Sequence, residues 1–282
     1  MIFRSRMMMV SPRDINVETN KKRVGIVDSF FDQQSMKLLI IGKTGAGKSS
    51  LCNIVSGHKF DSGLFPVSPG PVSCTQRTVF GNIFFGGNKT RPVSLIDTIG
   101  FDDPTKDVDT AIIAELVTKL KLKCDHVNLI GIAVNGQEPR LDASLIAMIK
   151  IFEDMFGEKF WKQCVLIFTK MPMDIKEKKR RIKNNGTTDE KLAEGYIKEV
   201  ESCFPGASGL QYLCLDACYD TEDVMEDKAF KAAMEELFRM LQDAPQLPTK
   251  EINENVFSKN GKLRRKIAEA EQKVKEVEIV CF

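Results

Sequence analysis

The sequence of 282 residues predicts an α/β fold, in which a mostly parallel sheet carries one antiparallel edge hairpin and is followed by a C-terminal helical extension. From residue 36 onward, segments typical of strands alternate with segments typical of amphipathic helices. This alternation indicates a sheet covered by helices on both faces. The turn signal Gly86-Gly87-Asn88 separates the second and third predicted strands, which are therefore expected to pair as an antiparallel hairpin.

The individual elements follow from the apolar pattern. The first strand is the apolar run Leu38-Leu39-Ile40-Ile41, which is typical of a buried parallel strand. The helix that begins at Leu141 repeats its apolar residues along one face. The predicted strands span residues 37–41, 78–85, 92–97, 127–134, 164–169 and 211–215. The predicted helices span residues 48–55, 107–120, 141–156, 189–201 and 225–241.

The chain is expected to have three parts: an N-terminal segment over residues 1–35, a globular domain over 36–243 and a C-terminal linker and amphipathic helix over 244–282. Two prolines, Pro245 and Pro248, end the globular pattern. Beyond them, apolar residues recur at alternating spacings of four and three, at Leu263, Ile267, Ala270, Val274 and Val277. This pattern fits either a helix folded back onto the domain or a short coiled coil.

Composition excludes several classes of protein. A formal net charge of +2 does not favour a nucleic-acid partner. The eight cysteines are scattered without zinc-ribbon spacing, which favours reduced thiols in a cytoplasmic protein. No apolar run approaches the roughly 20 residues that a membrane-spanning helix needs.

Residues 42–49 read Gly-Lys-Thr-Gly-Ala-Gly-Lys-Ser and fit the P-loop pattern G-x-x-x-x-G-K-[ST]. Between a predicted strand and a predicted helix, such a loop surrounds phosphate with backbone N–H groups and the positive end of the helix. Lys48 is expected to reach the β- and γ-phosphates, and Ser49 to ligate Mg²⁺. The predicted phosphate-binding residues are Gly42, Thr44, Gly45, Ala46, Gly47, Lys48, Ser49 and Ser50.

A second motif, D-x-x-G, ends the strand over residues 92–97. In P-loop switch proteins its aspartate, here Asp97, holds Mg²⁺ through water, and its glycine, Gly100, contacts the γ-phosphate. The proline-rich loop over residues 65–76 is the candidate for the first switch, which supplies a hydroxyl to Mg²⁺ and the γ-phosphate. Thr75 is the preferred residue for this role, with Ser73 and Thr78 as alternatives.

A third motif concerns the base. Thr169 and Lys170 follow an apolar strand and resemble the [NT]-K-x-D element that recognises guanine. Its aspartate position is occupied by Pro172, and Asp174, two residues later, either reaches the base or is a solvated loop residue. The last strand, over residues 211–215, is expected to deliver a backbone N–H to the base oxygen from Asp216 or Ala217.

Further segments carry a family resemblance. Residues 127–136 read Val-Asn-Leu-Ile-Gly-Ile-Ala-Val-Asn-Gly, residues 139–142 read Pro-Arg-Leu-Asp, and residues 151–157 read Ile-Phe-Glu-Asp-Met-Phe-Gly. Over roughly residues 36–242 the chain resembles the AIG-type, avirulence-induced GTPases, which include the vertebrate immunity-associated GTPases and are relatives of septins and chloroplast import GTPases. The resemblance implies a Ras-like G domain of the P-loop NTPase class, GTP and GDP binding, and GTP-dependent dimerisation across the switch face. For some members it also implies association with internal membranes or scaffolds.

The chain departs from this pattern at two catalytic positions. Phe101 stands where Ras-like enzymes carry a water-orienting glutamine, so intrinsic GTP hydrolysis is expected to be slow. Gln137 stands where some family members place an arginine, with Arg140 three residues along, and either residue is a candidate to act across a homodimer. The alternative for Arg140 is a cap or a salt bridge near the start of the helix at Leu141. The expected function is a slow, Mg²⁺-dependent GTPase switch. The alternative is a nucleotide-loaded scaffold with negligible hydrolysis, and an ATP-dependent enzyme is favoured only by Pro172.

The densest basic cluster spans residues 176–183. It fits a solvated helical insert, or a surface for anionic lipid or an acidic partner. The second interpretation predicts a peripheral position on a membrane.

Overall fold

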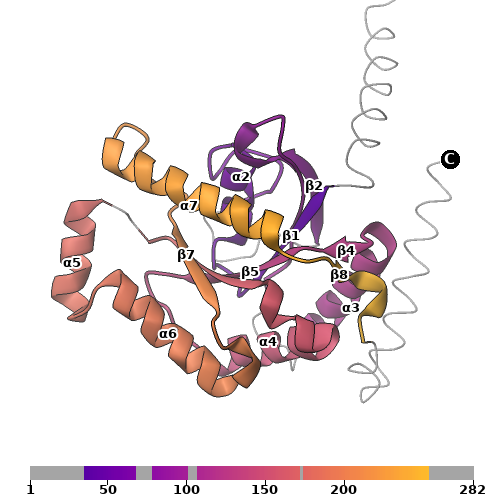
Figure 1. Ribbon diagram of the computed structural model, residues 1–282. Coiled ribbons are helices and arrows are strands. Elements are labelled where there is room, and N and C mark those ends of the chain that lie inside the picture. The colour runs from indigo at the N-terminus through magenta and orange to yellow at the C-terminus, as the bar shows by residue number, and fades with distance from the viewer. Residues whose placement is uncertain (1–34, 68–77, 101–106, 172–173, 254–282) are drawn as a thin grey trace, which may run out of the picture. The chain divides into compact units, whose positions relative to one another are not determined.

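Figure 1 shows the computed structural model, which describes residues 35–67, 78–100, 107–171 and 174–253. The chain divides into two units, Met1–Ser35 and Met36–Phe282, and the helices and strands described all belong to the second. Four residues named in the sequence analysis lie outside the described residues, as does the predicted C-terminal helix: Ser73, Thr75, Phe101 and Pro172.

The domain is built around a six-stranded sheet in the order β2-β3-β1-β5-β6-β7. All neighbouring strands are parallel except β2 and β3, which are antiparallel. This confirms the predicted mixed α/β sheet with an antiparallel hairpin at its edge. The strands are β1 (Met36–Gly42), β2 (Val79–Phe84), β3 (Pro92–Asp97), β5 (Leu129–Asn135), β6 (Cys164–Thr169) and β7 (Gln211–Leu215).

Helices cover both faces of the sheet (Figure 1). Successive residues of β1 point to opposite faces: Leu39 packs with α3, α4 and α6, whereas Leu38 packs with α2 and α7. The α-helices are α2 (Lys48–Val55), α3 (Asp107–Lys123), α4 (Ala143–Phe156), α5 (Ile175–Asn185), α6 (Asp189–Cys203) and α7 (Val224–Asp243). Short 3₁₀ helices span Phe85–Gly87, Gly157–Lys159, Trp161–Gln163, Pro205–Ala207 and Thr249–Glu251.

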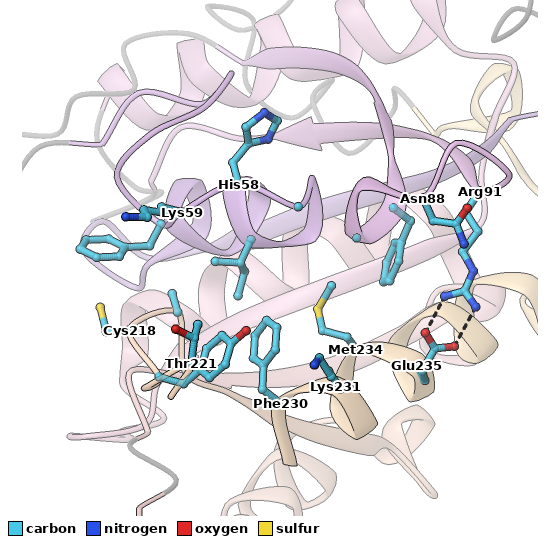
Figure 2. A pocket seen from close by; sticks show the side chains of 17 residues that line it. His58, Lys59, Asn88, Arg91, Cys218, Thr221, Phe230, Lys231, Met234 and Glu235 are labelled. Carbon is cyan, nitrogen blue, oxygen red and sulfur yellow. Dashed lines mark hydrogen bonds and ion pairs between the residues drawn. The ribbon is translucent and has the colours of Figure 1, made fainter. Parts of the chain in front are cut away.

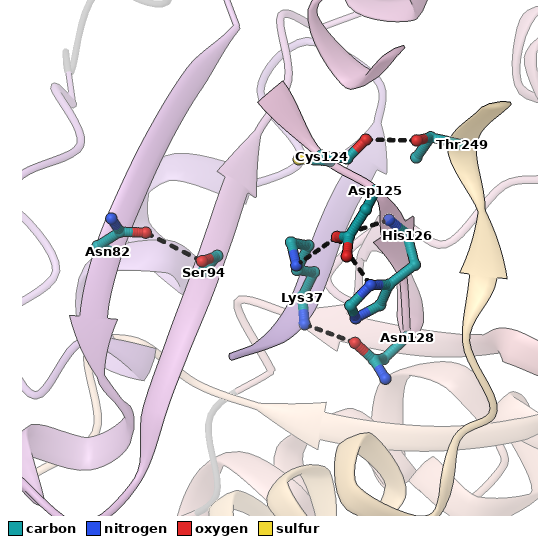
Figure 3. A network of polar contacts seen from close by, with 8 residues as sticks. All are labelled: Lys37, Asn82, Ser94, Cys124, Asp125, His126, Asn128 and Thr249. Carbon is teal, nitrogen blue, oxygen red and sulfur yellow. Dashed lines mark hydrogen bonds and ion pairs between the residues drawn. The ribbon is translucent and has the colours of Figure 1, made fainter. Parts of the chain in front are cut away.

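The β2–β3 hairpin turns through the predicted glycines. Gly86 and Gly87 have φ angles of 59° and 74°, a left-handed conformation that favours glycine. Across the two strands, the Ser94 hydroxyl is hydrogen-bonded to Asn82 Oδ1 at 2.9 Å (Figure 3). The turn places β2 beside β3 and leaves the carboxyl end of β3 beside β1, where the D-x-x-G motif begins.

The strand predicted over residues 127–134 is interrupted at Asn128. Its side-chain Oδ1 accepts a hydrogen bond from the Lys37 backbone N–H at 2.8 Å, and its own N–H donates to the Lys37 carbonyl at 2.9 Å. The two residues before it form a separate strand, β4 (His126–Val127), which pairs with β8 (Leu247–Pro248). Figure 3 shows the polar side chains that surround this junction.

The basic segment forms α5, which fits the interpretation as a helical insert. Asp174 caps its N-terminus by accepting from the Glu177 N–H at 2.7 Å, and Gly186 ends it with φ 66°. The chain also continues to pack on the domain after α7, because Leu247, Thr249 and Ile252 are buried.

Candidate functional site

The P-loop lies between the carboxyl end of β1 and the first turn of α2. Gly45 and Gly47 have φ angles of 76° and 78°, and Gly47 is the N-cap of α2, so the loop takes turns that side chains rarely permit. Lys48 is only 6% exposed, and its ammonium donates to the Lys43 carbonyl at 2.9 Å. The Lys48 ammonium and the N-terminus of α2 thus both lie at this loop, which is the arrangement that binds phosphate.

The two residues expected to hold Mg²⁺, Ser49 of the P-loop and Asp97 of the D-x-x-G motif, are in direct contact. The Ser49 hydroxyl donates to Asp97 Oδ2 at 2.7 Å, although the residues are 48 positions apart. Asp97 is fully buried, and its Oδ1 has no hydrogen-bond partner among the described residues. Burial raises the pKa of Asp97 to about 6, against the opposing effects of the Ser49 hydrogen bond and the Lys48 charge. A buried carboxylate oxygen without a partner, beside a hydroxyl, fits an oxygen-ligated cation such as Mg²⁺.

The D-x-x-G glycine packs against the P-loop itself. A Cβ on Gly100 would lie 2.5 Å from Thr44 Cα and 2.6 Å from Thr44 N. Thr98, between the two motif residues, donates through its hydroxyl to the Ile40 carbonyl at 2.9 Å. The absence of a side chain at Gly100 is therefore what allows the β3 end to approach the phosphate loop.

Thr169 and Lys170, at the carboxyl end of β6, contact the P-loop. The Thr169 hydroxyl lies 2.7 Å from the Ala46 carbonyl and 3.1 Å from the Val134 carbonyl. The Lys170 ammonium donates to the Gly45 carbonyl at 2.7 Å, and Lys170 takes a φ of 54°. A lysine in this left-handed conformation is uncommon, and here the conformation accompanies the contact with the loop.

A cavity of about 290 Å³ is lined in part by Thr169 and Lys170. Most of its polar lining residues were predicted from the sequence: Ser50, Thr169, Lys170, Asp216 and Gln137 all line it, together with Gly47 and Ala217. Asp216 is buried, and its Oδ1 accepts from the Cys218 N–H at 3.0 Å. The structure thus brings the ends of β6 and β7 and the P-loop around one space. Its volume is close to the lower end of the range for small-molecule sites.

Asp174 does not line this cavity. Its carboxylate is the N-cap of α5, as described above. The structure therefore gives Asp174 a local structural role, whereas it places Asp216 beside the candidate base site.

Arg140 lies on an exposed loop before α4, and the structure records no partner for its guanidinium among the described residues. The predicted helix start at residue 141 moves to Ala143, because the Asp142 side chain caps α4 by accepting from the Leu145 N–H at 3.0 Å. The Arg140 carbonyl accepts a long hydrogen bond, 3.5 Å, from the Tyr196 hydroxyl.

Sequence reasoning missed an ion pair between Lys43 of the P-loop and Asp142. Burial alone would raise the pKa of Asp142, but the Lys43 ammonium and the Leu145 amide hold it below its usual value. Asp142 was the second residue of the predicted helix, and an aspartate at a helix start indicates an N-cap but not its long-range partner. The pair links the phosphate loop to the start of α4.

The described residues hold neither a metal-binding cluster nor a membrane-spanning helix. They contain no group of three or more His, Cys, Asp or Glu side chains arranged to hold a metal ion. Among the same residues, no helix is both long enough and apolar enough to cross a membrane.

The fold and this site define the class of P-loop proteins with a Ras-like G-domain fold. Residues 36–184 match the AIG1 family, so the chain belongs to the AIG1 family, as the sequence resemblance predicted. No curated protein sequence matches the chain.

Solved structures of Toc33 from Arabidopsis thaliana are similar in fold. Its complex with GDP and Mg²⁺ is 16% identical in sequence, covers 83% of this chain and 96% of Toc33, and has a TM-score of 0.54. A dimerization-deficient arginine-to-alanine variant of Toc33 is 19% identical, with 80% and 90% covered and a TM-score of 0.52. A study of the chloroplast translocon components Toc33 and Toc159, which reports dimerization as important for their GTPase activity, provides a third structure. It is 16% identical, with 82% and 93% covered and a TM-score of 0.55.

Proposed function

We propose that this protein is a guanine-nucleotide switch that binds GTP and GDP with Mg²⁺ and hydrolyses GTP slowly. The observation that carries the proposal is the contact of Thr169 and Lys170 with the P-loop carbonyls of Ala46 and Gly45, both at 2.7 Å, beside the cavity of about 290 Å³. This contact joins a candidate base site to a phosphate loop. Membership of the AIG1 family and the Toc33 complex with GDP and Mg²⁺ support the same assignment.

A residue of this chain is proposed for each expected contact with the phosphates and with Mg²⁺. Lys48 binds the β- and γ-phosphates when it exchanges the Lys43 carbonyl for phosphate oxygens, and the amides from Thr44 to Ser49 surround the phosphates. Ser49 and Thr75 ligate Mg²⁺, with Asp97 holding it through water, and Gly100 contacts the γ-phosphate. Mg²⁺ supplies charge neutralisation of the phosphates.

For the base, we propose that the Asp216 carboxylate takes the role that the missing aspartate at Pro172 would have. Asp216 lines the cavity, whereas Asp174 is committed to capping α5. A carboxylate there accepts from the guanine N1–H and 2-amino groups, while the Ala217 N–H donates to the base oxygen. The stem of Lys170 lies along the base plane.

Base preference tests this proposal. Wild-type protein is expected to bind GDP far more tightly than ADP, because an unpaired buried polar group is costly. Asp216→Asn is expected to lose GDP affinity and gain affinity for xanthosine diphosphate, whose 2-oxo group accepts from the asparagine amide. Asp174→Asn is the matched control and keeps the guanine preference. Equal affinities of the wild type for GDP and ADP would contradict the GTPase assignment. An exchange of preference in Asp174→Asn instead would identify Asp174 as the base-reading residue.

We propose that hydrolysis is assisted across a homodimer formed through the P-loop face in the GTP state. Arg140 is exposed on that side of the domain, on the loop that Asp142 ties to Lys43, and Gln137 lines the nucleotide cavity. Support comes from the fold neighbours: dimerization is important for the GTPase activity of Toc33, and an arginine-to-alanine variant of Toc33 is dimerization-deficient.

Single-turnover hydrolysis at increasing protein concentration tests the dimer mechanism. The rate per molecule is expected to rise with concentration, and Arg140→Ala to lower it by about 10³-fold or more if the guanidinium acts as an arginine finger. Gln137→Ala, on the same loop, reports whether the amide contributes. A rate independent of concentration rejects the dimer mechanism but leaves nucleotide binding intact.

A scaffold that retains GTP is the second candidate, and Phe101 favours it because a phenyl ring cannot orient water by hydrogen bonding. Identifying the nucleotide that copurifies with the protein distinguishes the scaffold from the GTPase switch. Trapped GTP supports the scaffold, whereas GDP supports turnover.

Finally, we propose a cytoplasmic protein that associates peripherally with membranes through α5. This helix carries six basic residues and one acidic residue, and its two isoleucines, Ile175 and Ile182, are 59% and 43% exposed one heptad apart. Basic residues beside exposed apolar side chains favour an anionic lipid surface. Sedimentation with anionic and neutral vesicles tests this, and Ile182→Ser is expected to weaken binding to the anionic vesicles only. Equal sedimentation with both would reject it.

A further inference from the structure

A second and larger cavity, of about 720 Å³, lies outside the phosphate loop. We call it the α2–α7 cleft, because its lining comes from the end of α2 and the loop that follows it, from the β2–β3 turn, and from the middle of α7 and the loop before this helix. Figure 2 shows His58 and Lys59 on one side of the cleft and Phe230, Lys231 and Met234 on the other. Apart from Ala217, which also lines the nucleotide cavity, none of its lining residues has a role in the proposed nucleotide cycle.

The interior of the cleft is apolar and aromatic. Tyr219 and Phe230 stack with ring centroids 3.9 Å apart and an interplanar angle of 13°. Phe60 and Phe85 also line the cleft, and the ring centroids of Phe85 and Phe238 lie 5.0 Å apart. The volume lies within the range of about 300–1,000 Å³ that is typical of small-molecule sites, and preformed aromatic walls suit a flat or elongated apolar body.

The charged groups of the cleft are mostly cationic. Among the described residues that line it, Arg91, Lys231 and Lys59 are cationic, and Glu235 supplies the one carboxylate. Glu235 is bound by Arg91 through two hydrogen bonds of 2.6 and 2.9 Å, and Lys231 pairs with Asp227 at 2.6 Å. Lys59 has no ion-pair partner among the residues that the structure describes, and His58 lies next to it in the chain. The cationic end formed by Lys59 is therefore available to an acidic group.

From the aromatic interior and the free cation at its rim we infer that the α2–α7 cleft binds a small amphipathic anion, an aromatic or aliphatic body that bears one acidic head group. The body lies between Phe60 and the Tyr219–Phe230 pair, and the head group contacts Lys59. The cleft shares Ile54, Phe60, Ala217 and Cys218 with the nucleotide cavity but none of the phosphate-loop glycines, so the two sites are neighbours rather than one.

Two matched fluorescent probes test the inference on the full chain. Anilinonaphthalene sulfonate carries an aromatic body and a sulfonate, and phenylnaphthylamine has the same body without the charge. The sulfonate probe is expected to bind saturably with one site per chain, in the presence of saturating GDP as well as in its absence. Lys59→Glu is expected to weaken the sulfonate probe about ten-fold and to change the neutral probe less than about two-fold, because only the charge contact is reversed.

Two further variants control for folding and for nonspecific binding. Lys162→Glu makes the same charge change at an exposed lysine outside the cleft and is expected to leave both probes unaffected. Thr221→Trp fills the cleft from its exposed rim and is expected to weaken both probes, with an unchanged melting temperature as evidence of intact folding. The inference is overturned if the sulfonate probe shows no saturable binding, if Lys59→Glu and Lys162→Glu have equal effects, or if GDP displaces the probe completely.

Discussion

Single side chains decide how closely the segments of the nucleotide site approach one another. Gly100 meets the Thr44 backbone with no room for a Cβ, and Asp97 is buried against Ser49 with one oxygen unpaired. Both features bring the D-x-x-G motif into contact with the P-loop. At this scale, a change of one or two atoms is expected to have a measurable effect.

Gly100→Ala tests the close approach. The new Cβ would lie 2.5 Å from Thr44 Cα, so the P-loop or the β3 end must shift, which costs about 1–3 kcal/mol of stability. GDP affinity is expected to fall about ten-fold or more, measured by fluorescent-nucleotide titration, with a lower melting temperature. The matched control is Gly195→Ala in α6, where a Cβ meets nothing within 4 Å and is expected to stabilise the protein by up to about 1 kcal/mol. Unchanged GDP affinity in Gly100→Ala would contradict the contact.

His126 is expected to make the stability of the protein depend on pH. Burial and the Lys37 charge lower its pKa below the ordinary 6.5, although Asp125 Oδ1 lies 2.8 Å from Nδ1 and opposes them. Because the unfolded chain binds a proton at a higher pH than the folded protein does, this group destabilises the fold as pH falls below about 6.5. Urea denaturation at pH 7.5 and pH 5.5 measures the effect.

The His126→Asn variant isolates that contribution from the other titrating groups. It lacks the titrating ring, so its loss of stability between the two pH values is expected to be smaller than that of the wild type. An equal or larger loss in the variant would show that His126 is not the group responsible.

At the scale of elements, the strands and helices were largely predictable, whereas their junctions were not. Apolar runs and apolar faces predicted β1, β3, β6, β7 and α2 closely, because each is a local pattern. The break at Asn128 was missed because it depends on hydrogen bonds to Lys37, 91 residues away. The short strand β8 was missed for the same reason, since its partner β4 lies far away in the chain.

The ion pair between Lys43 and Asp142 joins two elements, the P-loop and α4. A double-mutant cycle with Lys43→Ala and Asp142→Asn measures the coupling, since asparagine keeps the N-cap of α4 and removes only the charge. The side chains are 35% and 42% exposed, so solvent screening limits the expected coupling energy to about 0.5–1 kcal/mol in chemical denaturation. Additive effects of the two changes would mean that the pair contributes nothing to stability.

At the scale of the whole domain, the segment after α7 contributes to the fold. The Thr249 N–H donates to the Asp125 carbonyl at 3.0 Å, and the Thr249 hydroxyl donates to the Cys124 carbonyl. Leu247 and Ile252 are buried on either side of it. These contacts tie the segment to the residues that precede β5.

Two shortened chains test this contribution. A chain ending at Asn253 keeps the segment, and a chain ending at Gln246 lacks it. The shorter chain is expected to be less stable by about 3–6 kcal/mol, because burial of each apolar side chain contributes about 1.5–3 kcal/mol. Comparing the two with each other, by urea denaturation, removes any effect of residues 254–282. Equal free energies of unfolding would show that residues 247–253 contribute nothing to the stability of the domain.

The sequence by itself determined the P-loop, the D-x-x-G motif, the mixed sheet and the family. Each of them is recognised from short segments whose residues are neighbours in the chain. Only the tertiary structure decided which aspartate lies at the candidate base site, Asp216 rather than Asp174, and that Lys43 pairs with Asp142. It alone showed the α2–α7 cleft. These features depend on the order of strands in the sheet and on how the helices pack over it, and local periodicity does not carry that information.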